Sequence, residues 1–223
     1  MRTNILRHKP KWLIPAAAIA TAAAVAGIKF YSESQFRYET SRLAETLELK
    51  PGMIVADIGA GEGKWTAAVA SRVGPGGHVF STELDPKRIE KIRRAVRKAG
   101  LANVTVVAAG PQETGLLENC CDAIFLRGVY HHLTQPAAIN QSLWKALRPG
   151  GLLVVIDFPP KLLLWPWRPK GVPNNRGGHG IPQRVLIDEL GREDFDMKAI
   201  ISDWPGGRYC VLFRKPTQIL SQL

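Results

Sequence analysis

Cysteine is scarce in this sequence, which holds three among 223 residues: Cys120 and Cys121 are adjacent, and Cys210 is distant. Cysteines in this arrangement form neither a disulfide framework nor a C-x-x-C metal spacing. We therefore expect no metal site, and a chain that works in a reducing compartment. Internal repeats are also lacking, which excludes solenoids and other repeat architectures.

Acidic residues are in short supply as well. The chain has 19 aspartates and glutamates against 30 lysines and arginines, so its net charge is +11 at pH 7 and its pI is about 9.9. A basic surface attracts nucleic acid, anionic lipid headgroups or acidic solutes, and charge alone does not choose among them. With 45% hydrophobic residues, the chain can bury one full core, so we expect one domain of catalytic size.

Long hydrophobic runs are absent except near the N-terminus. There a basic lead (residues 1–11) precedes a hydrophobic segment (residues 12–30), whose uncharged part, residues 12–28, is dominated by alanine. As a helix this part would reach about 25 Å, near the lower limit for crossing a hydrocarbon core of about 30 Å. A membrane anchor, a cleavable secretory signal and a surface-lying segment all remain open. Residues 31–50 are predicted to form an amphipathic helix that leads into a domain over residues 51–223.

The most informative stretch joins a short buried strand, residues 55–58, to a glycine-rich turn with a helix behind it. Gly59, Gly61 and Gly63 remove Cβ atoms where the backbone must turn sharply and lie against a ligand, and the helix start offers unpaired N–H groups. The dinucleotide fingerprint G-x-G-x-x-G is lacking, because it needs a glycine where the chain has Lys64. The turn therefore predicts a nucleotide-like ligand other than NAD.

The motif that stands there instead is D-x-G-x-G-x-G, from Asp57 to Gly63, and it resembles motif I of the class I S-adenosylmethionine (SAM) methyltransferases. A carboxylate at the strand end suits the ammonium and sulfonium of SAM better than a pyrophosphate. Glu83 closes the next predicted strand, where βαβ units place a carboxylate on the ribose hydroxyls. Further motifs at residues 129–133 and 147–157 extend the resemblance over about residues 49–157. They are similar to those of the ubiquinone and menaquinone C-methyltransferases and of many small-molecule enzymes.

The resemblance implies an α/β fold with a Rossmann-like, seven-stranded, mostly parallel sheet, helices on both faces and an antiparallel edge strand, preceded by the N-terminal hydrophobic helix. It also implies these cofactor-binding residues: Asp57, Gly59, Ala60, Gly61, Gly63, Glu83, Leu84, Gln112 and Arg127. That family usually has an aspartate after the third strand, hydrogen-bonded to the adenine amino group, and this chain has Gly110. Either Gln112 or Glu113 takes over the adenine edge, or SAM is held more weakly, by about 1 kcal/mol.

Methyl transfer from a sulfonium is an in-line displacement, so the protein mainly holds the reactants in line in a dry pocket. A base helps where the acceptor is a hydroxyl or an activated carbon. Tyr130, His131 and His179 are the predicted catalytic residues, and Asp157 is a further candidate. The resemblance implies that one of His131 and His132 lines the cofactor pocket while the other braces its loop.

Residues 158–184 contain no acidic residue and follow the fifth predicted strand, where an open α/β sheet presents its ligand crevice. We expect this segment to cover the substrate. Its tryptophans, Trp165 and Trp167, and its basic residues suit an apolar or amphiphilic substrate, or contact with a membrane surface.

The leading hypothesis is a membrane-associated SAM-dependent methyltransferase, of EC 2.1.1 type, with a small-molecule or lipid-like acceptor. One alternative is an RNA or protein methyltransferase that uses the basic surface, including a basic helix predicted over residues 85–99. Nucleic acid is not favoured, because residues 127–130 lack the Asn-Pro-Pro-Tyr of amino-directed enzymes. Another alternative is a non-catalytic SAM-binding or scaffold protein.

No obligate protein partner is evident in the sequence. Because SAM is made and kept in the cytosol, we expect the catalytic domain in the cytoplasm on an uncleaved single-pass anchor. The basic lead favours the opposite topology by the positive-inside rule, and the cofactor argument decides this expectation.

Overall fold

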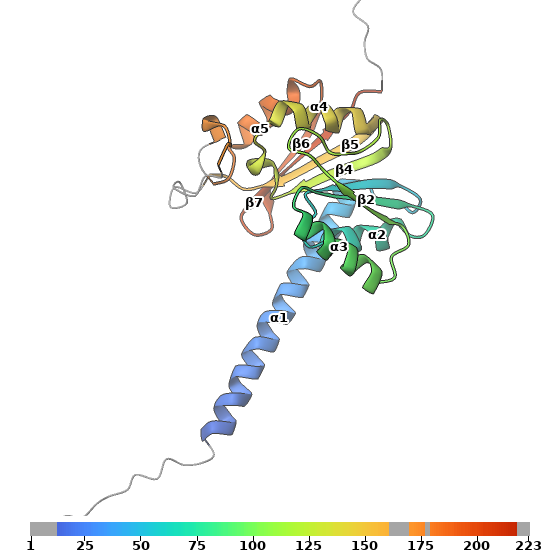
Figure 1. The fold of residues 1–223 in the computed structure, drawn as a ribbon. Helices are drawn as coiled ribbons and strands as arrows, with labels where there is room; N and C mark the ends of the chain where they lie inside the picture. Colours follow the sequence, from blue (N-terminus) through green and yellow to red (C-terminus); the bar gives the residue numbers. More distant parts are fainter. Residues whose placement is uncertain (1–12, 161–169, 177–178, 218–223) are drawn as a thin grey trace, which may run out of the picture. The chain divides into compact units, whose positions relative to one another are not determined.

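The structure, a computed structural model, describes residues 13–160, 170–176 and 179–217 (Figure 1). The chain divides into two compact units, Met1–Glu39 and Thr40–Leu223. Helix α1 (Leu13–Thr46) forms the described part of the first unit and continues into the second. Trp165 and Trp167, expected in the substrate cover, lie outside the described residues.

In the first unit α1 presents large apolar side chains to the surface, among them Ile19, Ile28 and Phe30. Within the described residues, no helix combines the length and the apolar character that crossing a membrane requires. The transmembrane helix predicted over residues 12–30 is therefore not found there.

The second unit is built on a seven-stranded sheet with the order β3-β2-β1-β4-β5-β7-β6. Its central strands are parallel, and β7 runs antiparallel between β5 and β6. The strands are β1 (Ile54–Ile58), β2 (His78–Glu83), β3 (Val104–Ala108), β4 (Cys121–Arg127), β5 (Leu147–Asp157), β6 (Asp196–Trp204) and β7 (Arg208–Arg214). The predicted Rossmann-like α/β fold is confirmed, including the mostly parallel sheet with an antiparallel strand towards one edge.

Helices cover both faces of this sheet, as Figure 1 shows. On one face lie α2 (Lys64–Val73) and α3 (Pro86–Lys98), and on the other α4 (Pro136–Ala146) and α5 (Gln183–Gly191). The alternation of side chains along β1 explains the two layers: Val55 packs in the apolar cluster that contains α2, and Ala56 packs in the cluster that contains α4 and α5. Strands covered on both faces read as continuous apolar runs, which is why β4 and β5 are buried almost throughout.

The strand register determines where polar side chains can gather. Asp57 of β1 pairs with Ser81 of β2 on one side and with Phe125 of β4 on the other. Parallel neighbours in this register end at the same edge of the sheet, so the residues that close β1, β2, β4 and β5 meet there. In an open α/β sheet this edge is the usual position of a ligand crevice.

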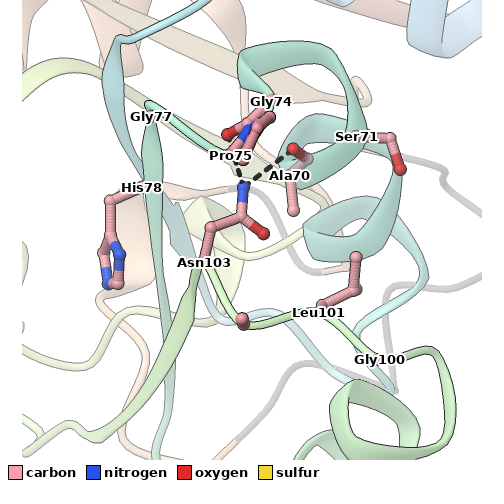
Figure 2. Close-up of a pocket in the computed structure, with 10 residues that line it drawn as sticks. Ala70, Ser71, Gly74, Pro75, Gly77, His78, Gly100, Leu101 and Asn103 are labelled. Carbon is pink, nitrogen blue, oxygen red and sulfur yellow. Dashed lines mark hydrogen bonds between the residues drawn. The ribbon is translucent and has the colours of Figure 1, made fainter.

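At the amino ends of the strands, a cavity of about 440 Å³ lies between the end of α2 and the segment before β3 (Figure 2). The amide nitrogen of Asn103 donates hydrogen bonds to the carbonyl oxygens of Ala70 (3.0 Å) and Gly74 (2.9 Å). Both carbonyls also accept a backbone hydrogen bond, that of Ala70 from the Gly74 amide and that of Gly74 from the Gly77 amide, each at 3.1 Å. Asn103 therefore fixes the end of α2 to the start of β3.

Replacing Asn103 by alanine should lower the free energy of unfolding by about 1–2 kcal/mol, because the two hydrogen bonds from its side chain to the end of α2 are lost. Urea denaturation measures the change. Ser71→Ala is the matched control: it removes an exposed hydroxyl of α2 that bonds to the Ala67 carbonyl, and should cost less than about 0.5 kcal/mol. Equal stability of the two variants would contradict the role of Asn103.

Candidate functional site

A cavity of about 550 Å³ opens at the carboxyl ends of β1, β2 and β4. Seven of the nine predicted cofactor residues line it: Asp57, Gly59, Ala60, Gly61, Glu83, Leu84 and Arg127. Gly63 supports the loop from below, where a Cβ would meet the Ile92 side chain at 3.2 Å. Only Gln112 lies away, and it lines a neighbouring hollow between Pro111 and α4.

The glycine loop lines this cavity, and glycine is needed at Gly59 and at Gly61 for different reasons. Gly59 has φ +69°, and a Cβ there would lie 2.6 Å from the Val129 side chain, so both backbone and space require glycine. Gly61 has φ +62° and open space around its Cα, so a ligand can lie against its backbone. The Ala60 amide donates to the carbonyl of Thr82 at 2.9 Å, which fixes the loop to the end of β2.

Glu83 is held by backbone amides on three sides. Its Oε2 accepts from the Gly61 amide at 2.9 Å, and its Oε1 accepts from the amides of Leu84 (2.9 Å) and Asp85 (3.2 Å). The Arg88 guanidinium lies 3.9 Å away. This carboxylate is therefore fixed in direction, and it retains lone pairs for hydroxyl donors from a ligand in the cavity.

Asp57 is held by side chains instead. Thr66, in the first turn of α2, donates its hydroxyl to Asp57 Oδ2 at 2.7 Å and lies 2.9 Å from the Ser81 hydroxyl. Burial raises the pKa of Asp57 to about 7, against the Thr66 hydrogen bond and with help from the nearby Glu83 charge. An opposite charge in the cavity would restore the ionised form. The site thus holds one fixed carboxylate and one whose charge depends on its occupant.

An arginine and a tryptophan form another part of the wall. The Arg127 guanidinium at the end of β4 stacks over the Trp65 ring, 4.5 Å from its centroid, and both residues line the cavity. Trp65 was not among the predicted site residues. Its position two residues after the last glycine of the motif is the signal in the sequence, since the first turn of that helix faces the ligand.

The space beside Gly110, where the family usually has an aspartate, is occupied by the side chain of Glu113. The Gly110 amide donates to the Glu113 carbonyl at 3.0 Å, and a Cβ on Gly110 would meet the Glu113 side chain at 3.2 Å. Glu113 lines the cavity and Gln112 does not, so of the two candidates for the adenine edge the structure favours Glu113. Gln112 points elsewhere because this tight turn directs consecutive side chains to different sides.

Tyr130 does not face the cavity, contrary to its predicted catalytic role. It is fully buried, and its hydroxyl donates to Glu189 of α5 (3.1 Å) and accepts from the side-chain amide of Asn140 of α4 (2.9 Å). Burial, and then the charge of Glu189, raise the pKa of Tyr130 far above its ordinary value. Tyr130 therefore serves as a structural link between the 3₁₀ turn η1 (Tyr130–His132) and the helices behind it.

The two histidines of η1 differ in their surroundings. His131 is buried and bound to Asp157 at the end of β5, with 2.8 Å from Nδ1 to Oδ1 and 3.1 Å from its backbone amide to Oδ2. It is not part of the cavity wall, whereas His132 is. His179, the third predicted catalytic residue, lies against both rings, at centroid distances of 4.9 and 5.8 Å.

The described part of the predicted substrate cover is anchored by a buried cation. Arg176, in the 3₁₀ turn η3 (Asn174–Arg176), donates to the Tyr130 carbonyl at 2.7 Å and pairs with Glu189. It has no solvent exposure. Within the described residues no cluster of three or more metal-ligating side chains is found.

Comparison with known proteins agrees with this geometry. Residues 55–151 match a family described as a methyltransferase domain. The ubiquinone/menaquinone biosynthesis C-methyltransferase of Vibrio cholerae is 30% identical over 115 residues, which are 51% of this chain and 44% of that protein. The protein-L-isoaspartate O-methyltransferase of Methanothrix thermoacetophila is 33% identical over 116 residues, 51% of each. The chain thus spans about half the length of the curated relatives it matches.

A solved structure shows the same fold. The SAM dependent methyltransferase from Aquifex aeolicus superposes with a TM-score of 0.68 at 22% identity, over 78% of this chain and 88% of that one. The chain therefore contains a class I SAM-dependent methyltransferase domain, whose cofactor is SAM. The predicted family and cofactor are confirmed.

The pKa of Asp57 predicts a pH-dependent affinity for SAM. Below about pH 7 the carboxyl is mostly protonated and does not attract a cation, so affinity should rise with pH, by up to about tenfold per unit below the pKa, and then level off. Calorimetry between about pH 5.5 and pH 7.5 measures this slope. Asp57→Asn should flatten it, and Glu62→Gln, an exposed loop acid paired with Lys91, should not. An equal slope in wild type and Asp57→Asn would contradict the assignment.

Gly59→Ala should weaken binding of the demethylated product, S-adenosylhomocysteine, by more than about tenfold, because Val129 and the loop must both move. Gly52→Ala is the control: its φ of +89° is equally strained, but its Cβ enters open space. Calorimetry should find product affinity unchanged in that variant, while thermal unfolding reports the backbone strain in both. Matching losses of affinity would show that strain alone, and not the loop's contact with Val129, sets binding.

Proposed function

We propose that this chain is an enzyme that transfers the methyl group of SAM to a small-molecule or lipid-like acceptor. The observation that carries the proposal is that the carboxylates of Asp57 and Glu83, from neighbouring strands, wall one cavity beside the glycine loop. A cationic nucleoside needs both acids at one cavity, so acids that pointed away from each other would have left it without a binding site.

The residues of the cavity fit the cofactor in charge and in space. Glu83, fixed by three amides, can accept hydrogen bonds from ribose hydroxyls, and Asp57 can ionise beside the ammonium or sulfonium. Gly61 leaves room for close approach. When bound, SAM supplies a methyl group on a positively charged sulfur. The chain's own residues bind and orient the reactants and exclude water.

The acceptor class is inferred from the rest of the cavity wall. Val129, Leu133 and Ile139 contribute apolar surface, while Thr134 and His132 contribute polar groups. This mixture supports an acceptor with an apolar body and a polar reacting end. The two relatives act, by their names, on a quinone carbon and on a protein isoaspartate, so they do not choose the acceptor for this chain.

The proposal keeps the domain in the cytoplasm, where SAM is made. The exposed apolar side chains of the first unit, such as Ile28 and Phe30, support a segment that lies on a membrane surface, one of the three interpretations drawn from the sequence. An acceptor of lipid character would then be met where it is dissolved.

Calorimetry with SAM and S-adenosylhomocysteine tests the proposal, and saturable binding to the wild-type chain is the expected result. Glu83→Gln should weaken binding by about tenfold or more, because a neutral amide replaces a charged acceptor, whereas Glu62→Gln should leave it unchanged. No saturable heat at millimolar ligand would end the proposal.

The second step offers methyl-labelled SAM to lipid, quinone, RNA and protein fractions. Label in the lipid or quinone fraction is expected. Label confined to RNA or protein would replace the proposed acceptor class by its alternative. Binding of SAM without transfer to any fraction would favour a non-catalytic SAM-binding protein.

A further inference from the structure

Three histidines from two distant parts of the chain gather beside the cofactor cavity. His131 and His132 follow β4, and His179 comes from the segment after β5. The ring centroids of His131 and His132 are 4.0 Å apart, and that of His179 lies 4.9 and 5.8 Å from them. Phe158 closes the group at 4.6 Å from His131. Of these rings His132 alone lines the cavity as the described residues define it.

The ring of His131 is fixed behind His132 by a buried carboxylate. Asp157 has no solvent exposure, and its oxygens accept from the His131 ring and backbone and from the Phe158 amide at 2.9 Å. Because Asp157 accepts at Nδ1, the proton of a neutral His131 lies on Nδ1. Its Nε2 then carries a lone pair, and among the described residues this buried nitrogen has no hydrogen-bond partner. An unpartnered buried polar atom is rare in a native fold, so within the described part of the chain this ring is held in place by Asp157 alone and not by bonds at both nitrogens.

The ring of His132 differs from His131 in exposure and in charge. One face packs on His131 while its edge remains open to the cavity. Partial burial, followed by repulsion from His131 and His179 and outweighing the attraction of Asp157, lowers the pKa of His132 to about 4; Arg88 acts in the same direction. His132 is therefore neutral at pH 7, so one of its ring nitrogens carries a lone pair, and the residue lines the cavity. A neutral ring also avoids repelling a cationic cofactor.

We propose that His132 is the catalytic base of the transferase, that His131 and Asp157 position it, and that the acceptor carries a hydrogen on the atom that is methylated, as a hydroxyl does. The inference rests on the proposed function. In the step, the acceptor atom forms a bond to the methyl carbon, the carbon–sulfur bond breaks with its electron pair passing to sulfur, and the proton of the acceptor passes to a ring nitrogen of His132. A methylated hydroxyl is strongly acidic until it loses that proton, so a weakly basic ring is sufficient.

The cluster also admits a purely structural role, in which three rings only fill space next to the cavity. The two roles differ in what a substitution does. Glutamine at position 132 keeps hydrogen-bonding groups but takes up no proton, so it removes the base and leaves much of the packing. A packing role predicts lost stability or cofactor affinity. A base predicts lost transfer with affinity retained.

The first test compares wild type, His132→Gln and, as control, His78→Asn, which changes a histidine at the opposite edge of the sheet (Figure 2). Calorimetry with S-adenosylhomocysteine should give affinities within about twofold for all three. Methyl-labelled SAM is then offered with a phenol, a hydroquinone, a primary alcohol and a tertiary amine. We expect label on a hydroxyl-bearing probe, and a loss of about 100-fold in His132→Gln only.

Transfer by His132→Gln at the rate of wild type would overturn the assignment, as would preferred transfer to the tertiary amine, which has no proton to lose. Both results leave the proposed function standing. If wild type fails to bind S-adenosylhomocysteine, the proposed function fails as well, so the two failures are distinguishable.

The second test needs no acceptor and decides the matter if no probe is methylated or the variant fails to fold. Nitrogen-15 spectra of the histidine rings in the full chain should show His132 neutral at pH 7 and shifted by S-adenosylhomocysteine, and His131 with its proton on Nδ1. A charged His132, a proton on Nε2 of His131, or His132 signals that ignore the ligand would overturn the proposal.

Discussion

The hydroxyl of Thr66 joins the three elements on which the cofactor cavity depends. It belongs to the first turn of α2, donates to Asp57 at the end of β1 and lies within hydrogen-bond distance of Ser81 in β2. All three side chains are buried, so no water replaces these bonds. The glycine loop runs between Asp57 and Thr66, and its two ends are therefore set. The direction of its amides towards Glu83 and the cavity follows from that.

The two acids of the cavity obtain their properties from different kinds of neighbour. Glu83 is surrounded by backbone amides, which cannot move without unfolding the loop, and its role depends on geometry. Asp57 is surrounded by apolar strands and a hydroxyl, so that its role depends on charge. A cation entering the cavity changes the second acid and leaves the first as it was. Under the proposed function, recognition of the sugar and recognition of the charge would then belong to separate strands.

The sequence predicts the part of the site that is local in the chain. Strand, glycine spacing and strand-end acid are adjacent in sequence, which is why a local pattern is enough to bring Asp57, Gly59, Gly61 and Glu83 to one cavity. The orientation of Tyr130 depends on Asn140, Arg176 and Glu189, which come from elements far along the chain, and no local pattern contains that information. Of the two neighbouring histidines, partners in β5 decide which one faces the cavity. Which of Gln112 and Glu113 faces the cavity likewise depends on the conformation of their turn, and residue types do not predict that conformation.

Arg176 restricts the movement of the 3₁₀ turn that carries it. Its guanidinium is enclosed, and its partners are a carbonyl of the histidine-bearing turn and a carboxylate of α5. Withdrawing a buried cation from such partners costs several kcal/mol, so Arg176 stays in place in all but a small fraction of the molecules at equilibrium. The 3₁₀ turn η3 is therefore held against the turn that carries the histidines and against α5.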